Sequence, residues 1–326
     1  MTDQDKNNVK HDIRNLTESD QDIEKIWQMW HTIFPEWPIE KQRMGKLLFG
    51  FPDQHHFIHD QGFIISSLTN GVHGRVAAVG VLPAYRRKGL GTALMEKAQA
   101  ALREASSAGQ GRKLESLEIG SIFPRYWPQV PKAFSAEVKE FFLHRGFQEA
   151  PEPVRDLFKD VRESIAPPEI MARVSKTNVK FSPWSVELYE ECMKKQRAQF
   201  HWDAIYEALA AHGQHQEVMV AFDPETNEQI GWTLMCSPSS VASDTFAFLP
   251  LYPSGNKTGL IAAVGVDEKA RGKGVGLALV VKAVENLRER GVEGILIDSV
   301  SIRGFYERLG FDVHWEYGVR YVSPGL

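Results

Sequence analysis

The stretch AAVGVLPAYRRKGLG occupies residues 77–91, and a second stretch, AAVGVDEKARGKGVG, occupies residues 262–276. The first five residues of the two stretches are identical, and an Arg, a Lys and two glycines recur at matching positions without a gap. Each stretch is followed by a second shared motif, KEFFLHRGF at residues 139–147 and RGFYERLGF at residues 303–311. Two landmarks repeated in the same order predict that the chain folds as two similar halves.

The length and composition of the chain agree with two domains. The chain has 326 residues, of which 43% are hydrophobic and 25% charged, as is typical of proteins with packed cores. Pro167 and Pro168 lie between the halves, and adjacent prolines disfavour both helix interiors and central strands. We therefore predict a first domain over residues 1–160, a linker over 161–176 and a second domain over 177–326.

The charge and cysteine content exclude several classes of partner and site. The formal net charge is −4 and the pI is near 6.3, so we expect neither nucleic acid nor a membrane as partner. Cys192 and Cys236 are the only cysteines, which excludes a disulfide framework. The segment HHFIH at residues 55–59 has no carboxylate at ligand spacing, so we expect no metal. Residues 1–12 are polar, contain no signal-peptide pattern, and favour a cytoplasmic location.

Each repeated stretch predicts a strand, a turn and a long helix in that order. The apolar, β-branched segments 75–81 and 260–266 are typical of strands, and the segments that follow the turns have helical periodicity. Helices are expected at residues 89–105, 133–145, 274–290 and 303–309, and further strands at 114–120 and 294–298. This order predicts the α/β class, with a mixed sheet in each half.

The turn between strand and helix is suited to binding a phosphate or pyrophosphate. A helix N-terminus offers unpaired backbone N–H groups, glycines allow close approach, and Arg and Lys add positive charge. The residues in question are Arg86, Lys88, Gly89 and Gly91 in the first half, and Arg271, Lys273, Gly274 and Gly276 in the second. Neither copy has the Gly-Lys-Ser/Thr of a Walker A loop or the glycine spacing of a dinucleotide fold.

These motifs resemble those of the GNAT acetyltransferase superfamily. Its pyrophosphate motif, Arg/Gln-x-x-Gly-x-Gly/Ala, is matched by Arg86-Arg87-Lys88-Gly89-Leu90-Gly91 and by Arg271-Gly272-Lys273-Gly274-Val275-Gly276. Its later Gly-Phe landmark is matched by residues 305–311. The resemblance implies two GNAT-like domains arranged as a pseudo-dimer, each a mixed, mostly antiparallel sheet flanked by helices. It also implies acetyl-CoA as cofactor, with the pantetheine arm bound by backbone groups of Val79 and Val81, or of Val264 and Val266.

The same resemblance implies an N-acetyltransferase and distinguishes the two halves. In the family a tyrosine of the late helix protonates the departing thiolate, and Tyr306 stands at that position. Phe142 stands at the matching position of the first half and has no proton to donate. We therefore expect the second domain to be catalytic and the first to be catalytically degenerate. Asp298 is our candidate general base, with a role as a helix cap as the alternative.

The resemblance leaves the acceptor and some roles open. The expected reaction is direct attack by a primary amine on acetyl-CoA in a ternary complex, and the acceptor is a small-molecule amine or a protein amino group. The alternative function is a non-catalytic acyl-CoA-binding sensor or scaffold protein. Tyr126 and Trp127 either line the substrate cleft or cap a partner domain, with packing within their surface loop as the alternative. A monomer or a homodimer is compatible with the sequence.

Overall fold

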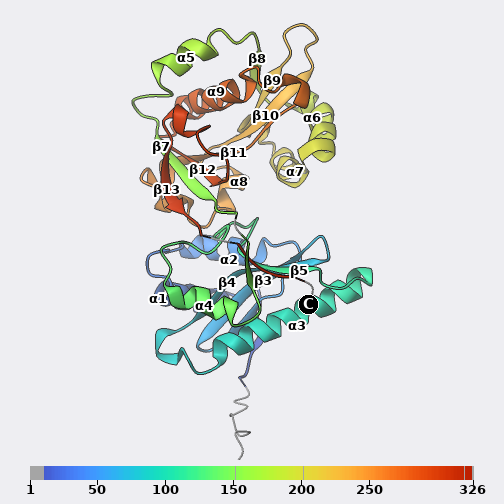
Figure 1. Cartoon of the computed structure of the whole chain (residues 1–326), viewed down its shortest axis with the longest axis vertical. Coiled ribbons are helices and arrows are strands. Elements are labelled where there is room, and N and C mark those ends of the chain that lie inside the picture. The colour runs from blue at the N-terminus through green and yellow to red at the C-terminus, as the bar shows by residue number, and fades with distance from the viewer. Residues whose placement is uncertain (1–10, 151, 201, 319, 325–326) are drawn as a thin grey trace, which may run out of the picture. The chain divides into compact units, whose positions relative to one another are not determined.

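The computed structural model describes residues 11–150, 152–200, 202–318 and 320–324. The chain divides into two compact units, one formed by Met1–Pro153 with Tyr317–Leu326 and the other by Val154–Glu316. Among the described residues, no helix combines the length and apolar character needed to cross a membrane. Each unit is a sheet with helices packed on it (Figure 1).

The first unit contains a mixed sheet whose described strands follow the order β1-β2-β3-β4-β5-β14-β6. The β4–β5 pair is parallel and the other pairs are antiparallel. The strands are β1 (Arg14–Asn15), β2 (Phe57–His59), β3 (Gly62–Thr69), β4 (His73–Val81), β5 (Ser116–Ile119), β6 (Gln148–Ala150) and β14 (Arg320–Pro324). The helices are α1 (Asp20–Ile33), α2 (Lys41–Phe49), α3 (Leu90–Gln110) and α4 (Ala136–Leu143).

The second unit repeats this arrangement with the described strand order β13-β7-β12-β11-β10-β9-β8. Here β11–β12 is the parallel pair, and the other pairs are antiparallel. The strands are β7 (Arg155–Asp160), β8 (Lys180–Pro183), β9 (Val218–Phe222), β10 (Gln229–Cys236), β11 (Thr258–Val266), β12 (Gly294–Val300) and β13 (Asp312–Glu316). The helices are α5 (Pro168–Val174), α6 (Tyr189–Lys195), α7 (Asp203–Ala211), α8 (Val241–Asp244) and α9 (Val275–Glu289). These two sheets confirm the predicted α/β class.

Alternating side chains bury both faces of each sheet. In β3, Phe63 stacks on Trp30 of α1 at 5.9 Å, whereas its neighbour Ile64 joins the cluster around α3. In β11, Ile261 packs with α9, whereas Leu260 joins the opposite cluster. Burial on both faces explains why these strands are almost continuously apolar.

The compact units differ from the predicted domain boundaries because each sheet contains a strand that the predicted boundaries assign to the other half. Strand β7 precedes the expected linker, yet it pairs with β12 and β13, and Leu157 is fully buried in the second core. Strand β14 ends the described chain, yet it pairs with β5, and Tyr321 contacts Phe142 at 5.5 Å. Pro168 begins α5, where a missing N–H is tolerated, so the expected linker contains a helix.

The late helix expected in the second half is wrong in extent. The structure has bends at residues 304–306 and only a short 3-10 helix, η8 (Glu307–Leu309). Gly304 has a φ of 74°, which an α-helix running through residues 303–309 does not accommodate. The corresponding helix of the first half, α4, is present as expected.

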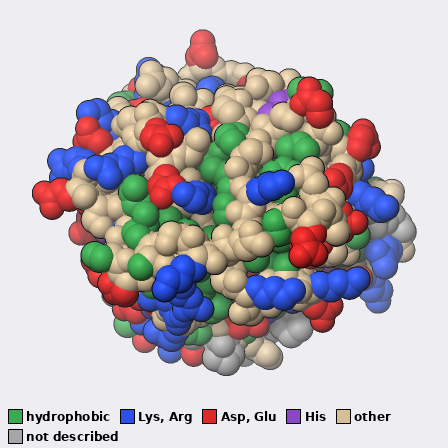
Figure 2. All heavy atoms as spheres, turned by 90° about the horizontal axis from the view of Figure 1, so that it is seen from above, with side chains coloured by type: hydrophobic (Ala, Val, Ile, Leu, Met, Phe, Trp, Pro, Cys, Tyr) green, Lys and Arg blue, Asp and Glu red, His purple; other side chains and the backbone are tan. Residues whose placement is uncertain are grey.

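The surface carries both signs of charge. On the face drawn in Figure 2, Lys, Arg, Asp and Glu side chains intermingle around scattered hydrophobic ones. This mixture agrees with the small net charge of −4.

Candidate active site

In each sheet the parallel pairing stops before β4 or β11 ends; in the first unit β5 itself ends at Ile119, whereas in the second unit β12 continues beyond the last pair. In the described residues, the pairing of β4 with β5 ends at Val76↔Ile119, although β4 continues to Val81. The pairing of β11 with β12 ends at Ile261↔Ile297, although β11 continues to Val266. Beyond these points the backbone of β4 or β11 can bond a ligand that enters between the strands. Val79 and Val81 lie on the diverging part of β4, as do Val264 and Val266 on that of β11.

The two glycine-rich turns have nearly the same backbone geometry. Gly89 and Gly274 are the N-caps of α3 and α9, with φ values of 87° and 84°. Two residues before each N-cap, Arg87 has a φ of 62° and Gly272 has a φ of 76°. These left-handed conformations turn the chain so that it enters the helix N-terminus from the strand end.

The cations of the turns are exposed and partly fixed. Arg86 Nε donates to the carbonyl of Val81 at 3.1 Å, and Arg271 Nε donates to that of Val266 at 3.0 Å. Lys88 and Lys273 are exposed beside them. At the other side of each turn, Gly91 lies against Phe141 and Gly276 against Val266 and Phe305, so both glycines also allow close packing. Both halves therefore present a cationic helix N-terminus beside an opened strand pair.

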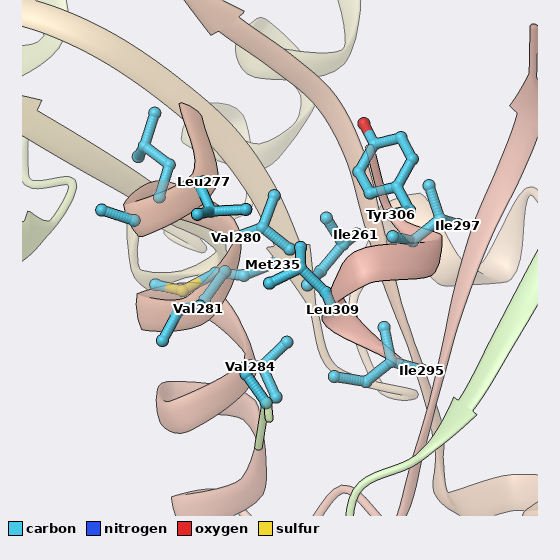
Figure 3. Packing of buried hydrophobic residues seen from close by; sticks show 14 of the residues in the cluster. Met235, Ile261, Leu277, Val280, Val281, Val284, Ile295, Ile297, Tyr306 and Leu309 are labelled. Atoms are coloured by element: carbon cyan, nitrogen blue, oxygen red, sulfur yellow. The ribbon is translucent and has the colours of Figure 1, made fainter. Parts of the chain in front are cut away.

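Tyr306 lies between Phe305 and Phe311 in the second unit. Its ring meets that of Phe305 at 4.8 Å and that of Phe311 at 6.4 Å, and the side chain is 9% exposed. Figure 3 shows the hydroxyl directed away from Leu309 and Ile295, out of the core cluster. Burial and the nearby carboxylate of Asp298 raise the pKa of Tyr306 to about 12. The phenol therefore holds its proton at neutral pH and can act as a donor.

Asp298 is half-buried in β12, beyond the point where β12 separates from β11. Residues 299 and 300 continue β12, so no helix starts there for Asp298 to cap. The N–H of Ser299 instead donates to Asp156 Oδ1 at 2.8 Å. Asp298 acts on Tyr306 electrostatically, since its carboxylate helps to raise the pKa of the phenol.

Two groups near the opened strands of the second unit were missed by sequence reasoning. Phe200 belongs to η3 (Gln196–Phe200), a π-helix, and its ring lies against Gly265, since a Cβ there would be 2.9 Å from it. Lys195 Nζ pairs with Asp267 Oδ2 at 2.5 Å, directly after β11. Their closeness to β11 depends on the fold of residues 189–200, which has no recognisable motif.

The first unit contains a large cleft at the corresponding place. A cavity of about 790 Å³ extends from the turn at Arg86 and Gly89 along β4 to the loop after β5. Trp127 lines this cavity, whereas Tyr126 is 2% exposed and stacks on Phe51 at 6.2 Å in the core. Phe142 is buried at the position that Tyr306 has in the second half.

Two family models match the chain. The model described as "Acetyltransferase (GNAT) family" matches residues 179–311, and the model described as "Acetyltransferase (GNAT) domain" matches residues 52–149. Together they cover most of the chain and match one domain in each half.

Curated relatives with similar sequences are acetyltransferases. A probable glucosamine 6-phosphate N-acetyltransferase 2 of Oryza sativa subsp. japonica is 31% identical over 109 residues, which cover 33% of this chain and 61% of the relative. A mycothiol acetyltransferase of Saccharomonospora viridis is 26% identical over 258 residues, which cover 73% of this chain and 71% of the relative.

Solved structures with a similar fold include GNAT proteins. One is a GCN5-related glucosamine N-acetyltransferase region of a fungal multi-domain GH3 β-N-acetylglucosaminidase, with a TM-score of 0.85 and 26% identity. That likeness covers 95% of this chain and only 38% of the fungal one. A tandem GNAT protein from the clavulanic acid biosynthesis pathway has a TM-score of 0.64 and 15% identity, covering 96% of this chain and 98% of that one. By its two family-model matches and its fold, this chain belongs to the GNAT acetyltransferase family, as a member with two GNAT domains in tandem.

Proposed function

We propose that the protein is an acetyl-CoA-dependent N-acetyltransferase whose second unit transfers the acetyl group to a primary amine by direct attack in a ternary complex. The observation that carries this proposal is the buried Tyr306, whose pKa is raised by burial and by the carboxylate of Asp298, in the unit where β11 and β12 separate. Tyr306 has a raised pKa and a hydroxyl directed out of the core.

Binding would use the exposed turn that precedes α9. Its backbone N–H groups and the side chains of Arg271 and Lys273 suit the pyrophosphate of the cofactor. The diverging segment of β11 would bind the pantetheine arm through the backbone of Val264 and Val266. Gly272, Gly274 and Gly276 allow the close approach that these contacts require.

Chemistry would use the two side chains near the end of β12. Asp298 would accept a proton from the attacking amine, because only a neutral amine has the electron pair that forms the new C–N bond. Backbone N–H groups of β11 would stabilise the negative charge that develops on the carbonyl oxygen. As the C–S bond breaks, Tyr306 would donate its proton to the departing sulfur, leaving an amide and free coenzyme A.

We propose an amino sugar of the glucosamine type as the acceptor class to test first. The support is the likeness to the fungal glucosamine N-acetyltransferase region, which extends over 95% of this chain at 26% identity. The name of the rice relative, a glucosamine 6-phosphate N-acetyltransferase, points the same way.

Calorimetric titration of acetyl-CoA, together with an assay of glucosamine acetylation, tests which unit works in matched variants of the two turns. Gly274→Glu and Gly89→Glu each place a side chain and a negative charge at a left-handed helix N-cap. We expect Gly274→Glu to abolish acetylation of glucosamine, and Gly89→Glu to leave turnover in place. Loss of turnover only with Gly89→Glu would assign catalysis to the first unit, and absence of acetyl-CoA binding by the wild type would refute the proposal.

A further inference from the structure

Tyr306 lies on a segment that gives its side chain little support of its own. The segment has bends at residues 304–306 and the single 3-10 turn η8, and both Tyr306 and Leu309 lie on it (Figure 3). A 3-10 turn has fewer and poorer hydrogen bonds than several α-helical turns would have. The orientation of Tyr306 therefore depends on contacts between this segment and neighbouring elements.

Two buried cations of β7 hold the segment at its two ends. Arg155 Nη1 donates to Glu307 Oε1 at 2.8 Å, and its Nη2 donates to the carbonyl of Ile302 at 3.0 Å. Lys159 Nζ donates to the carbonyl of Leu309 at 2.6 Å. Arg155 is 5% exposed and Lys159 is 7% exposed, so water competes little for these bonds. The two cations are four residues apart on one strand and therefore lie on the same face of it.

Asp156, the next residue of β7, holds the part of β12 that carries Asp298. Ser299 follows Asp298 and has a φ of 52°, where the register between β12 and β7 shifts. A bulge of this kind leaves a backbone group without its partner in the sheet. Asp156 Oδ1 accepts from the N–H of Ser299 at 2.8 Å, and its Oδ2 accepts from the hydroxyl of Tyr252 at 3.0 Å. The carboxylate is 5% exposed and thus fixes the backbone beside Asp298.

We propose that Arg155 and Asp156 are positioning residues for acetyl transfer in the second unit, a proposal that rests on the proposed function. Arg155 acts through the segment that carries Tyr306, and Asp156 acts through the bulge beside Asp298. Neighbouring residues of a strand point to opposite faces, so one short strand reaches both segments. The GNAT family model for this half begins at residue 179, and β7 lies before it.

This role separates the rate of transfer from the binding of the cofactor. Acetyl-CoA is proposed to bind to β11 and to the turn before α9, whereas the bonds of Arg155 and Asp156 described above reach residues 299, 302 and 307 of the segments beside them. Misplacement of a reacting group by about 1 Å costs up to about 100-fold in rate. Loss of these bonds should therefore lower kcat while acetyl-CoA affinity stays the same.

The test measures kcat for glucosamine acetylation by the full chain, and acetyl-CoA affinity by calorimetry. Arg155→Met and Asp156→Ala remove the bonds, and each should lower kcat by about 10- to 100-fold while affinity stays within about twofold of the wild type. Arg155→Lys keeps a donor and Asp156→Asn keeps an acceptor at the same places, so both should recover most of the rate.

Phe158→Leu is the matched control on the same strand. The ring of Phe158 packs on Tyr252 at 5.8 Å and on His314 at 5.9 Å, so this variant should destabilise the unit and keep the wild-type kcat. Hydrogen exchange of peptides from residues 298–309 gives a readout that is independent of turnover. Exchange there should be faster in Arg155→Met and Asp156→Ala than in Phe158→Leu.

Wild-type kcat in both Arg155→Met and Asp156→Ala would overturn the proposal, as would an equal fall of kcat in Phe158→Leu. Wild-type exchange of residues 298–309 in both variants would overturn it whatever the turnover. A wild-type rate in Tyr306→Phe would instead refute the proposed function, and a wild-type protein without turnover would overturn both proposals.

Discussion

Gly294 of β12 lies where an added methyl group would meet the ring of Phe158 on β7. A Cβ at this position would be 2.2 Å from Ser254 Oγ and 2.4 Å and 2.6 Å from two atoms of the Phe158 ring, which is closer than packed atoms allow. The ring cannot easily move, because it stacks on Tyr252 at 5.8 Å and contacts His314 at 5.9 Å. We therefore predict that Gly294→Ala destabilises the second unit by about 1–3 kcal/mol, the usual cost of overpacking.

The backbone of Gly294 makes this prediction specific to the contact. Its φ is not in the left-handed region. Without the clash, alanine would therefore stabilise the folded unit by about 0.4–1 kcal/mol, because it lowers the conformational entropy of the unfolded chain. Gly109 in α3 is the matched control, since a Cβ there meets nothing within 4 Å. Gly109→Ala should be stabilising by up to about 1 kcal/mol.

The assay is urea unfolding monitored by hydrogen exchange of peptides from residues 294–300, because two units need not unfold together. In the Phe158→Ala background, Gly294→Ala should destabilise the second unit much less than it does in the wild type. The coupling energy between the two substitutions should be about 1 kcal/mol or more. A neutral Gly294→Ala, or strictly additive effects, would refute the pairing of β7 with β12 and the strand exchange that follows from it.

Three further predictions concern pH and backbone strain. Burial lowers the pKa of His56 from 6.5 to about 4. The stability that the neutral ring provides above pH 6.5 is therefore lost as the pH falls toward 4, and the loss amounts to about 3 kcal/mol. The Tm of the first unit should accordingly fall more steeply with acid in the wild type than in His56→Gln. Arg87 has a φ of 62° where the second half has Gly272. Arg87→Gly should therefore stabilise the first unit by about 1 kcal/mol and raise its Tm, whereas Gly272→Ala should destabilise the second unit by about 1 kcal/mol and lower its Tm. Burial raises the pKa of Tyr306 to about 12, so kcat should show no loss from its ionisation up to pH 10; a fall near pH 10 that disappears in Tyr306→Phe would contradict this.

The strand–turn–helix units could be predicted because their determinants are local. Glycine at the N-cap, an apolar strand before it and helical periodicity after it all lie within about 30 consecutive residues. The repeat then made each half a check on the other. The contrast between Tyr306 and Phe142 was likewise visible from residue identity alone.

The strand exchange could not be predicted, because pairing partners are decided by tertiary contacts. Strands β7 and β14 are short apolar-polar segments whose sequences would fit either sheet. The prolines at 167 and 168 indicated a break in the chain, and the break proved to be the start of a helix. The expected helix at residues 303–309 failed at Gly304, whose left-handed φ no helical pattern reveals.

One part of the cleft of the first unit also lay beyond sequence reasoning. Phe134 comes from the segment before α4, and its ring stacks on that of Phe34 at the end of α1 only in the folded structure. The one signal was the density of aromatic residues and prolines in residues 122–131, which indicated an ordered loop without revealing its contacts.

The central claim, that the second unit transfers the acetyl group with Tyr306 as proton donor, is tested most directly by single-turnover kinetics. Release of the coenzyme A thiol would be followed after mixing acetyl-CoA and glucosamine with Tyr306→Phe, and with Tyr189→Phe as the matched control in the same unit. We predict a rate about 100-fold or more below the wild type for Tyr306→Phe, with acetyl-CoA affinity unchanged, and a wild-type rate for Tyr189→Phe. A wild-type rate of thiol release by Tyr306→Phe would contradict the account.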